Sequence, residues 1–240
     1  MNIVNQNLKK ETAVAADLCE KWMLNHIYDE NIYTGNIADP ISYYKWPLTL
    51  IVRDKKDEAV KLLRWINEKC LTANGDYLSD RSGFHKEFHT YSTLWIVLAA
   101  IKLEDTGLVE KLLNFILKYH NSETGGLATF PAKPEIITED MVSTAFLGMV
   151  ACELKDKNLA DKILHYFERM FSLQTEDEKF WLRINRNGSL IKTFDLKDDT
   201  KKYSINIGKE EECYYLLGAA CFFIARYIES FDDKPLYLAR

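Results

Sequence analysis

Four titratable side chains occupy matching places in this sequence: Asp39, His89, Asp140 and Glu210. When four segments of the chain are laid over one another, each of these residues falls just before a long apolar run or in its first turn. Carboxylates and a histidine that meet around one cavity can exchange protons with a bound molecule. Burial beneath apolar side chains would also raise a carboxyl pKa toward neutrality, as a general acid requires. The sequence therefore predicts an acid–base site, with Asp140 as the acid and His89 as its partner base.

Helix capping is the alternative explanation for the carboxylates. Asp39 precedes Pro40, and an N-cap Asp followed by Pro is typical of a helix start. An acidic residue in a first helical turn, such as Glu210, gains about 0.3–1 kcal/mol from the helix dipole. Both explanations stand for Asp140. His89 is different, because histidine is not a preferred cap residue.

The segment FHKEFHTY, residues 84–91, is the densest in side chains with chemical uses. His85, Glu87 and His89 would share one face of an extended segment, and the two histidines would lie one turn apart in a helix. Either arrangement could serve metal binding, hydrogen bonding or proton transfer. Because HExxH is absent and no further ligands can be identified, we predict no metal centre. Surface or satisfied core residues are the alternative.

Lys45 and a group of aromatic residues are expected to line the same cavity. Lys45 takes the place that Trp95 and Phe146 occupy in two of the other segments, where a cation is costly unless it is paired or exposed. It could anchor an anionic substrate group, balance Asp140, or extend to solvent at the rim. The aromatic side chains could hold an apolar chain, a carbocation-like intermediate or a sugar ring, although core packing would account for some of them. They are Tyr43, Tyr44, Trp46, Tyr91, Trp95, Phe146, Tyr214 and Tyr215.

The elements that must position these residues come from an internal repeat. The repeated segments are residues 32–75, 76–124, 125–178 and 179–230, a period of about 50 residues that is expected of repeated helical hairpins. In the second segment, YSTLWIVLAAIKLEDTGLVEKLLNFI aligns without a gap with VSTAFLGMVACELKDKNLADKILHYF in the third. Each segment contains a short extended piece near glycine, an almost wholly apolar helix, a charged turn and an amphipathic helix.

An apolar helix must be buried, whereas an amphipathic helix meets water on one side. The order of the elements thus predicts inner and outer helices in alternation, as in an α/α solenoid that closes fully or partly into a toroid. We expect an all-α protein with one domain over residues 1–240, about four such hairpins, and a first helix from about Leu8 to Ile27. The segments that lead into the inner helices would meet at one mouth of the central cavity.

The fourth segment departs from this pattern. Asn187-Gly188 lies between two runs of alternating polarity, which is a strong signal for a β-hairpin. We predict strands at Phe180–Arg186 and Ser189–Phe194. Arg183 and Arg186 on this hairpin could reach over the cavity mouth.

Inner and outer helices that alternate after glycine-bearing turns, with GGLATFP followed by EDMVSTAFLGMVACEL, resemble the α/α-toroid superfamily. Its members include terpenoid cyclases, protein prenyltransferase β-subunits and several sugar-processing enzymes. The resemblance covers roughly residues 30–230 and concerns architecture. The acidic DxDD-type motif of squalene-type cyclases and the Asp/Cys/His zinc set of the prenyltransferases are both absent from the sequence. We therefore assign neither the cyclase activity nor the prenyltransferase activity to this sequence.

Composition and the absence of certain motifs exclude several classes of partner, location and cofactor. The net charge of −5 with no basic block argues against a nucleic-acid partner. The five cysteines are an odd number without zinc-site spacing, which favours reduced thiols in a cytosolic protein. No apolar segment resembles a signal peptide or a membrane span, and no P-loop or dinucleotide fingerprint is present. We expect a soluble, cytoplasmic protein that needs no cofactor and could form a homo-oligomer.

Three functions are compatible with these features. The first is a lyase, isomerase or cyclase that transfers protons to a terpenoid-like or other largely apolar substrate, with Lys45 as a charge anchor. The second is a carbohydrate-active toroid, a glycosidase or epimerase, in which Asp39 and Asp140 form the carboxylate pair. The third is a non-enzymatic helical-repeat protein that binds a peptide or protein on its concave face.

Overall fold

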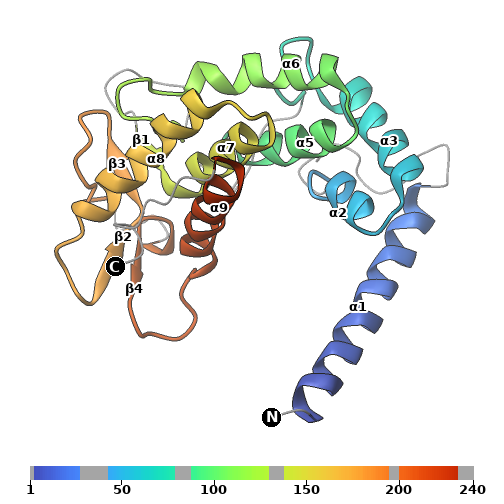
Figure 1. Cartoon of the computed structure of the whole chain (residues 1–240), viewed down its shortest axis with the longest axis horizontal. Helices are drawn as coiled ribbons and strands as arrows, with labels where there is room; N and C mark the ends of the chain where they lie inside the picture. Colours follow the sequence, from blue (N-terminus) through green and yellow to red (C-terminus); the bar gives the residue numbers. More distant parts are fainter. Residues whose placement is uncertain (1–2, 28–42, 79–87, 130–137, 195–199, 232–240) are drawn as a thin grey trace.

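The computed structural model describes residues 3–27, 43–78, 88–129, 138–194 and 200–231, and most of these residues are helical (Figure 1). The helices are α1 (Ile3–Ile27), α2 (Trp46–Val52), α3 (Lys56–Trp65), α5 (Tyr91–Lys102), α6 (Thr106–Ile116), α7 (Met141–Glu153), α8 (Lys157–Ser172) and α9 (Tyr215–Phe231). Short π- or 3₁₀-helical turns are η2 (Ile66–Cys70), η3 (Leu117–Tyr119) and η4 (Thr200–Lys202). Within the described ranges, no helix is both long and apolar enough to cross a lipid bilayer. The prediction of a mainly helical protein is confirmed.

Buried and half-buried helices alternate along the chain. The side chains of α5 are buried from Tyr91 to Ala100 apart from Trp95, and every side chain of α7 from Met141 to Cys152 is buried. In contrast, α6 and α8 bury only one face. The inner helices α2, α5, α7 and α9 pack side by side in that order, and α3, α6 and α8 each pack on the inner helix that precedes them (Figure 1). The helical pairs thus follow the order that the internal repeat predicts.

The turns within the three helical pairs share one geometry. The backbone is left-handed at Asp54, Glu104 and Lys155, with φ of 59°, 57° and 58°. In each turn the next residue donates its backbone N–H to a carbonyl of the inner helix: Lys55 to Leu50, Asp105 to Ala100, and Asp156 to Ala151. The carboxylates of Asp105 and Asp156 also cap the outer helices by accepting from the N–H groups of Leu108 and Leu159. The repeat is therefore present in the backbone conformation as well as in the sequence.

Replacing Asp156 by Ala should remove the N-cap of α8 and lower the free energy of unfolding by about 1 kcal/mol. Asp156→Asn should retain most of the stability, because the amide oxygen can accept the same hydrogen bond from Leu159. Urea unfolding followed by circular dichroism measures the difference. Equal stabilities of the Ala and Asn variants would show that this hydrogen bond does not stabilise α8.

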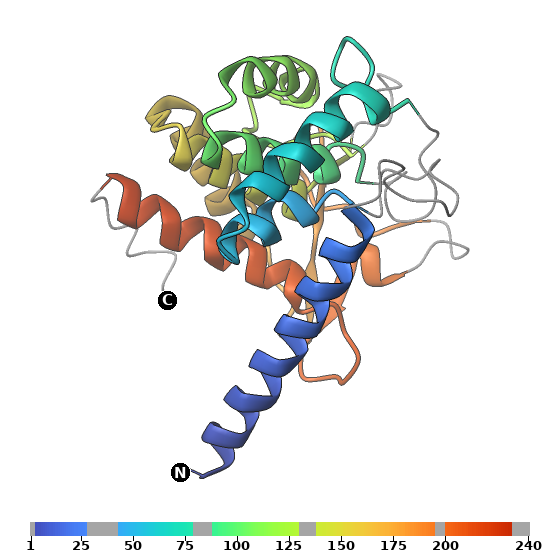
Figure 2. The same cartoon turned by 90° about the vertical axis from the view of Figure 1, so that its right-hand side faces the viewer.

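Helix α1 projects from the body of the molecule, and only its C-terminal part lies against other elements (Figures 1 and 2). It begins at Ile3 instead of the predicted Leu8. Met23 is buried, and the guanidinium of Arg53 donates to the carboxylates of Asp17 and Glu20, the latter at 2.6 Å. The helix is therefore fixed towards its C-terminal end, and its side chains from Leu8 to Ala15 are exposed.

Strands in the described part of the chain form two short antiparallel pairs. Strand β1 (Thr138–Asp140) pairs with β3 (Arg183–Asn185), and β2 (Lys179–Trp181) pairs with β4 (Ser204–Asn206). In the first pair the register sets Asp140 opposite Arg183. Strand β1 leads directly into α7, so this pair lies at the N-terminal end of the most deeply buried helix.

The β-hairpin predicted at residues 180–194 is only partly present. The turn at Asn187-Gly188 forms, with Gly188 at φ 73° and a bridge between Ile184 and Leu190. The predicted strand Phe180–Arg186, however, is broken at Leu182, whose N–H donates to Tyr203 and whose carbonyl accepts from Met141. The predicted strand Ser189–Phe194 is reduced to the bridge at Leu190. The predicted pairing is confirmed next to the turn, where Asn185 and Ile191 donate their N–H groups to the carbonyls of Ser189 and Arg183. The longer pairings of β3 and β2 are with β1 and β4, from other parts of the chain.

The glycine pair that precedes β1 allows two close approaches. Gly125 has φ 81°, and a Cβ atom there would lie 2.0 Å from the carbonyl oxygen of Lys162 in α8. A Cβ atom on Gly126 would lie 2.2 Å from Oε2 of Glu139. Both positions therefore require glycine for the loop to lie against α8 and β1.

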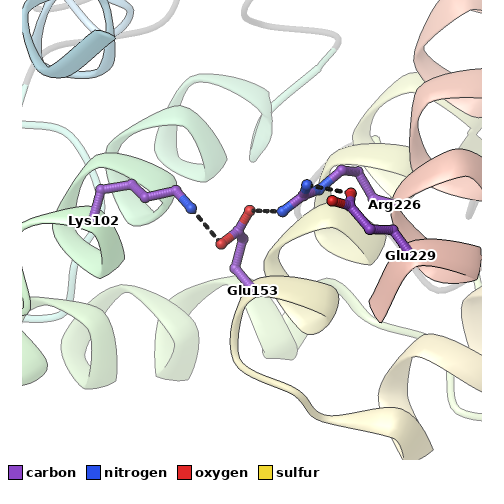
Figure 3. A network of polar contacts seen from close by, with 4 residues as sticks. All are labelled: Lys102, Glu153, Arg226 and Glu229. Carbon is purple, nitrogen blue, oxygen red and sulfur yellow. Dashed lines mark hydrogen bonds and ion pairs between the residues drawn. The ribbon is translucent and has the colours of Figure 1, made fainter. Parts of the chain in front are cut away.

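A chain of charged side chains joins the C-terminal ends of the inner helices (Figure 3). Glu153, the last residue of α7, accepts at 2.5 Å from Lys102 of α5 and at 2.5 Å from Arg226 of α9. Arg226 also donates to Glu229. Burial alone would raise the pKa of Glu153, but the hydrogen bonds and charges of Lys102 and Arg226 outweigh it and hold the pKa below its usual value.

Glu153→Gln should lower the free energy of unfolding by about 1–2 kcal/mol at pH 7, because two charge-assisted hydrogen bonds are weakened. Since the folded-state pKa of Glu153 lies below its unfolded value, this contribution is present at neutral pH and is lost as the pH falls through the folded-state pKa. Urea titrations over a range from pH 7 downward should therefore show a difference that is largest at pH 7 and shrinks as the pH falls through the folded-state pKa of Glu153. Glu229→Gln, at an exposed position, is the matched control and should change stability by less than about 0.5 kcal/mol.

Candidate functional site

Asp140 ends β1 and caps α7. Its side chain is 1% exposed, and its Oδ1 atom accepts from the backbone N–H of Ser143 at 2.7 Å. The other carboxylate oxygen, Oδ2, is buried with no hydrogen-bond donor among the described residues. Burial raises the pKa of Asp140 to about 6, although the hydrogen bonds from Ser143 and the charge of Arg183 oppose the rise. A carboxyl group with this pKa is partly protonated near neutral pH, so it can donate a proton.

Arg183 lies across the strand pair from Asp140. Its side chain is fully buried, and its Nε atom donates to the carbonyl oxygen of Lys202 at 3.0 Å. The guanidinium lies over the ring of Tyr203 at 4.2 Å and over that of Phe88 at 5.1 Å. The sequence suggested that Arg183 reaches over a cavity mouth, whereas the structure places it in the core beside the candidate acid. The signal in the sequence is a single cation within the apolar run FWLRI.

An aromatic cluster lies next to Asp140 and is built from residues of different inner helices. The ring centroids of Tyr91 and Phe146 are 5.0 Å apart, and those of Trp95 and Phe146 are 4.9 Å apart. Tyr44, just before α2, lies 5.9 Å from Tyr91 and 6.3 Å from Trp95. Burial, followed by the nearby Tyr91, raises the pKa of Tyr44 well above its usual value. Tyr91 is also close enough to Asp140 for the carboxylate charge to add to the rise that burial causes in the Tyr91 pKa.

Lys45 lies at the exposed edge of this cluster. Its Nζ atom is 5.4 Å from the ring centroid of Tyr44 and 5.3 Å from that of Trp95. Trp95 and Tyr44 are themselves half-buried, in contrast to the buried Tyr91 and Phe146. The cluster therefore extends from a solvent-facing cation to the buried Tyr91, which lies within reach of the charge of Asp140.

Three of the other predicted aromatic residues have packing or turn roles. Tyr43 is buried, 5.0 Å from Trp46 and 5.6 Å from Trp65, and Trp46 packs in turn on Trp22 of α1. Tyr214 donates its hydroxyl to the carbonyl oxygens of Asn206 and Lys209. Tyr215, the first residue of α9, is close enough to Tyr44 to contribute to the rise of its pKa.

His89 is directed toward the outer helix and not toward Asp140. Its ring lies 5.2 Å from that of Tyr119 and 6.0 Å from that of Phe115, and its Nε2 atom is 3.7 Å from the carboxylate of Asp76. No hydrogen bond or ion pair joins His89 to Asp140, both of which the structure describes. The structure thus separates the two residues that the sequence paired as base and acid.

The starts of the two inner helices α5 and α7 differ in backbone conformation. Asp140 is extended, with φ −110° and ψ 149°, and its side chain folds back onto the first turn of α7. Thr90, the residue before α5, is instead in the right-handed helical region, with φ −94° and ψ −11°. The N–H of His89 donates to Thr129 in the loop before β1.

The remaining predicted site residues lie apart from the cluster or outside the described ranges. Glu210 is exposed in the turn region that precedes α9. Asp39, His85 and Glu87 lie outside the described residues. Among the residues that are described, no three His, Cys, Asp or Glu side chains come together as a metal site would require. The structure therefore brings together Asp140, Tyr91, Phe146, Trp95, Tyr44 and Lys45, with Arg183 beside them.

No protein-family model matches the chain, and no curated protein matches it. The chemistry of this site is therefore the basis for assigning a function.

Asp140→Asn should raise the free energy of unfolding at pH 7, by up to about 3 kcal/mol, because the pKa of Asp140 is higher in the folded than in the unfolded protein. Between about pH 4 and 6 the folded protein therefore binds more protons than the unfolded protein does, so its stability falls as the pH rises through that range. Asparagine keeps the cap on Ser143 and carries no charge. Chemical unfolding at pH 4 and pH 7 should show the gain only at pH 7; a loss of stability at pH 7 would contradict the assigned pKa.

Proposed function

We propose that the protein is an acid–base enzyme, a lyase, isomerase or cyclase, that acts on a terpenoid-like or other largely apolar small molecule. The observation that carries this proposal is the buried carboxyl group of Asp140, with its raised pKa and unpartnered Oδ2 atom, whose charge reaches Tyr91 of the aromatic cluster. A structural cap needs only Oδ1. The second oxygen, kept from water at a cost in stability, is available to a substrate.

The proton transfer follows from this arrangement. Protonated Asp140 donates its proton to a carbon–carbon double bond or a hydroxyl group of the substrate and becomes a carboxylate. The cation that develops on the substrate lies near Tyr91, Phe146 and Trp95, whose ring faces stabilise positive charge. The carboxylate, stabilised by Ser143 and Arg183, can then take a proton from a neighbouring carbon to complete an isomerisation or elimination.

The proposal includes a helical row that is curved into a full or partial toroid. The row begins with α2 and ends with α9, yet Tyr215 of α9 lies near Tyr44 at the start of α2. This proximity supports an arrangement in which the N-terminal ends of the inner helices converge on the aromatic cluster. Such convergence supports a central binding site at that end of the helices.

A carbohydrate-active enzyme would need a second carboxylate facing Asp140. Glu139 is adjacent in the chain, but it accepts hydrogen bonds from Asn121 and Thr124 at 2.7 Å each. Successive residues of a strand point to opposite faces, so Glu139 supports the glycine loop and not the aromatic cluster. The described residues therefore favour the proton-transfer enzyme.

Proton transfer by Asp140 can be detected without a known substrate. Purified protein is incubated in D₂O with a mixture of isoprenoid and other unsaturated apolar compounds, and products are analysed for deuterium and changed retention by gas chromatography with mass spectrometry. We expect a labelled or isomerised product whose formation falls as the pH rises above about 6, because the acid form of Asp140 is lost.

Asp140→Asn should abolish this labelling while the protein remains folded, and Tyr91→Leu, which removes a ring face, should reduce it. Asp57→Asn, at an exposed position on α3, is the matched control and should label normally. Labelling that persists in Asp140→Asn would refute the assigned acid.

A further inference from the structure

The ammonium group of Lys45 lies in a corner formed by two aromatic rings. Its Nζ atom is 5.4 Å from the ring centroid of Tyr44 and 5.3 Å from that of Trp95, and ring faces attract a cation within about 6 Å. The two ring planes are inclined at 75°, with their centroids 6.3 Å apart. No carboxylate of the described residues forms an ion pair with Lys45. The rings are therefore what holds this cation.

Other lysines that lie over aromatic rings have a carboxylate beside them. Lys157 is paired with Asp161 at 2.8 Å, and Lys192 with Glu176 at 2.7 Å. Lys179 is close enough to Glu176 for its positive charge to act on that carboxylate. In these three places a carboxylate balances the cation. The corner at the start of α2 has no such ion pair among the described residues, so its attraction for positive charge comes from the ring faces.

The aromatic surface continues inward from the corner. The ring of Trp95 lies 4.9 Å from that of Phe146 and 6.3 Å from that of Tyr91, and the last two residues are buried. An inorganic cation must give up strongly bound water to contact such a surface. An ammonium group that carries alkyl substituents is more weakly hydrated, and aromatic cages in proteins select such groups.

We propose that the corner between Tyr44 and Trp95 is a binding site for the alkylated ammonium group of a small molecule, and that Lys45 occupies this site as a tethered cation in the free protein. The inference goes beyond the proposed function and requires no proton transfer by Asp140. Because Lys45 is exposed, its side chain can turn into solvent when a ligand enters. Lys45 thus competes with the ligand and lowers its affinity.

Displacement of Lys45 is tested with choline as the probe. Binding is measured by saturation-transfer NMR on the N-methyl protons, with sodium chloride replaced by choline chloride so that the ionic strength stays constant. Lys45→Met removes the charge and keeps an unbranched side chain. This variant should bind choline about two- to five-fold more tightly than the wild type, because no cation–ring contact has to be displaced.

Lys179→Met is the matched control, because it removes a cation from over another tryptophan ring, that of Trp181. Its affinity for choline should equal that of the wild type. Circular dichroism should show unchanged folding for both variants, since Lys45 is exposed and Lys179 is half-buried on a short strand. Absence of saturable choline binding in folded Lys45→Met would overturn the proposal.

An uncharged probe of the same shape separates charge from apolar contact. Neohexyl alcohol, in which a carbon atom replaces the nitrogen of choline, should bind Lys45→Met at least about two-fold more weakly than choline does, because it lacks the attraction to the ring faces. Equal affinities for the two probes would show that the corner does not recognise positive charge, which would overturn the proposal.

The rings are tested in the Lys45→Met background. Adding Trp95→Leu removes one ring face and should weaken choline binding, whereas Trp95→Phe keeps a smaller ring and should have an intermediate effect. Unchanged binding in both would place the probe elsewhere and contradict the assigned site.

An anionic probe tests the opposite role for Lys45. If Lys45 anchors an anionic group, the wild type should bind hexanoate, Lys45→Met should lose that binding, and choline binding should be the same in both proteins. That result would overturn the proposal. We expect instead that choline binding responds to Lys45→Met and that neither protein binds hexanoate at this corner.

Discussion

Helix α7 is buried around its whole circumference, and the rest of the structure is arranged to cover it. From Met141 to Cys152 every side chain is buried, so neighbours are needed on every side. Helices α5 and α9 flank it, and α8 covers it from outside. On the α9 side the contact is so close that a Cβ atom on Gly148 would lie 2.4 Å from the ring of Phe223. At its C-terminal end, Glu153 pairs with cations from both flanking helices.

The same constraint explains why the N-cap of α7 is also a carboxyl group with a raised pKa. The N-terminal end of a buried helix leaves N–H groups that water cannot reach, so a side chain must accept from them. Asp140 does so through Oδ1, and the burial that makes the cap necessary also raises its pKa. The two explanations that the sequence left open for this residue are therefore compatible, because each uses a different oxygen of one carboxylate.

The sequence was most informative where structure is set by local pattern. The apolar runs became α5 and α7, and the charged turns after them adopted one repeated backbone conformation at Glu104 and Lys155. Strand pairing was less predictable. Strands β2 and β3 lie on either side of Leu182, and each pairs with a strand from another part of the chain: β2 with β4, and β3 with β1. The site was predicted in part. Asp140, Tyr91 and Phe146 come together as the repeat implies, but the direction of His89 depends on the backbone before α5, which repeat alignment does not reveal.

The strand pair β1–β3 has a kinetic consequence. It spans only three residue pairs, and Asp140, whose Oδ2 atom has no hydrogen-bond partner among the described residues, forms one of them. Separating so short a ladder costs far less free energy than unfolding the helical row, so local opening is expected to be more frequent than global unfolding. Water would then reach Asp140 during brief openings while α5, α7 and α9 remain packed. The hydration of the carboxyl group is thus governed by the lifetime of a small β-ladder, separately from the stability of the helices that surround it.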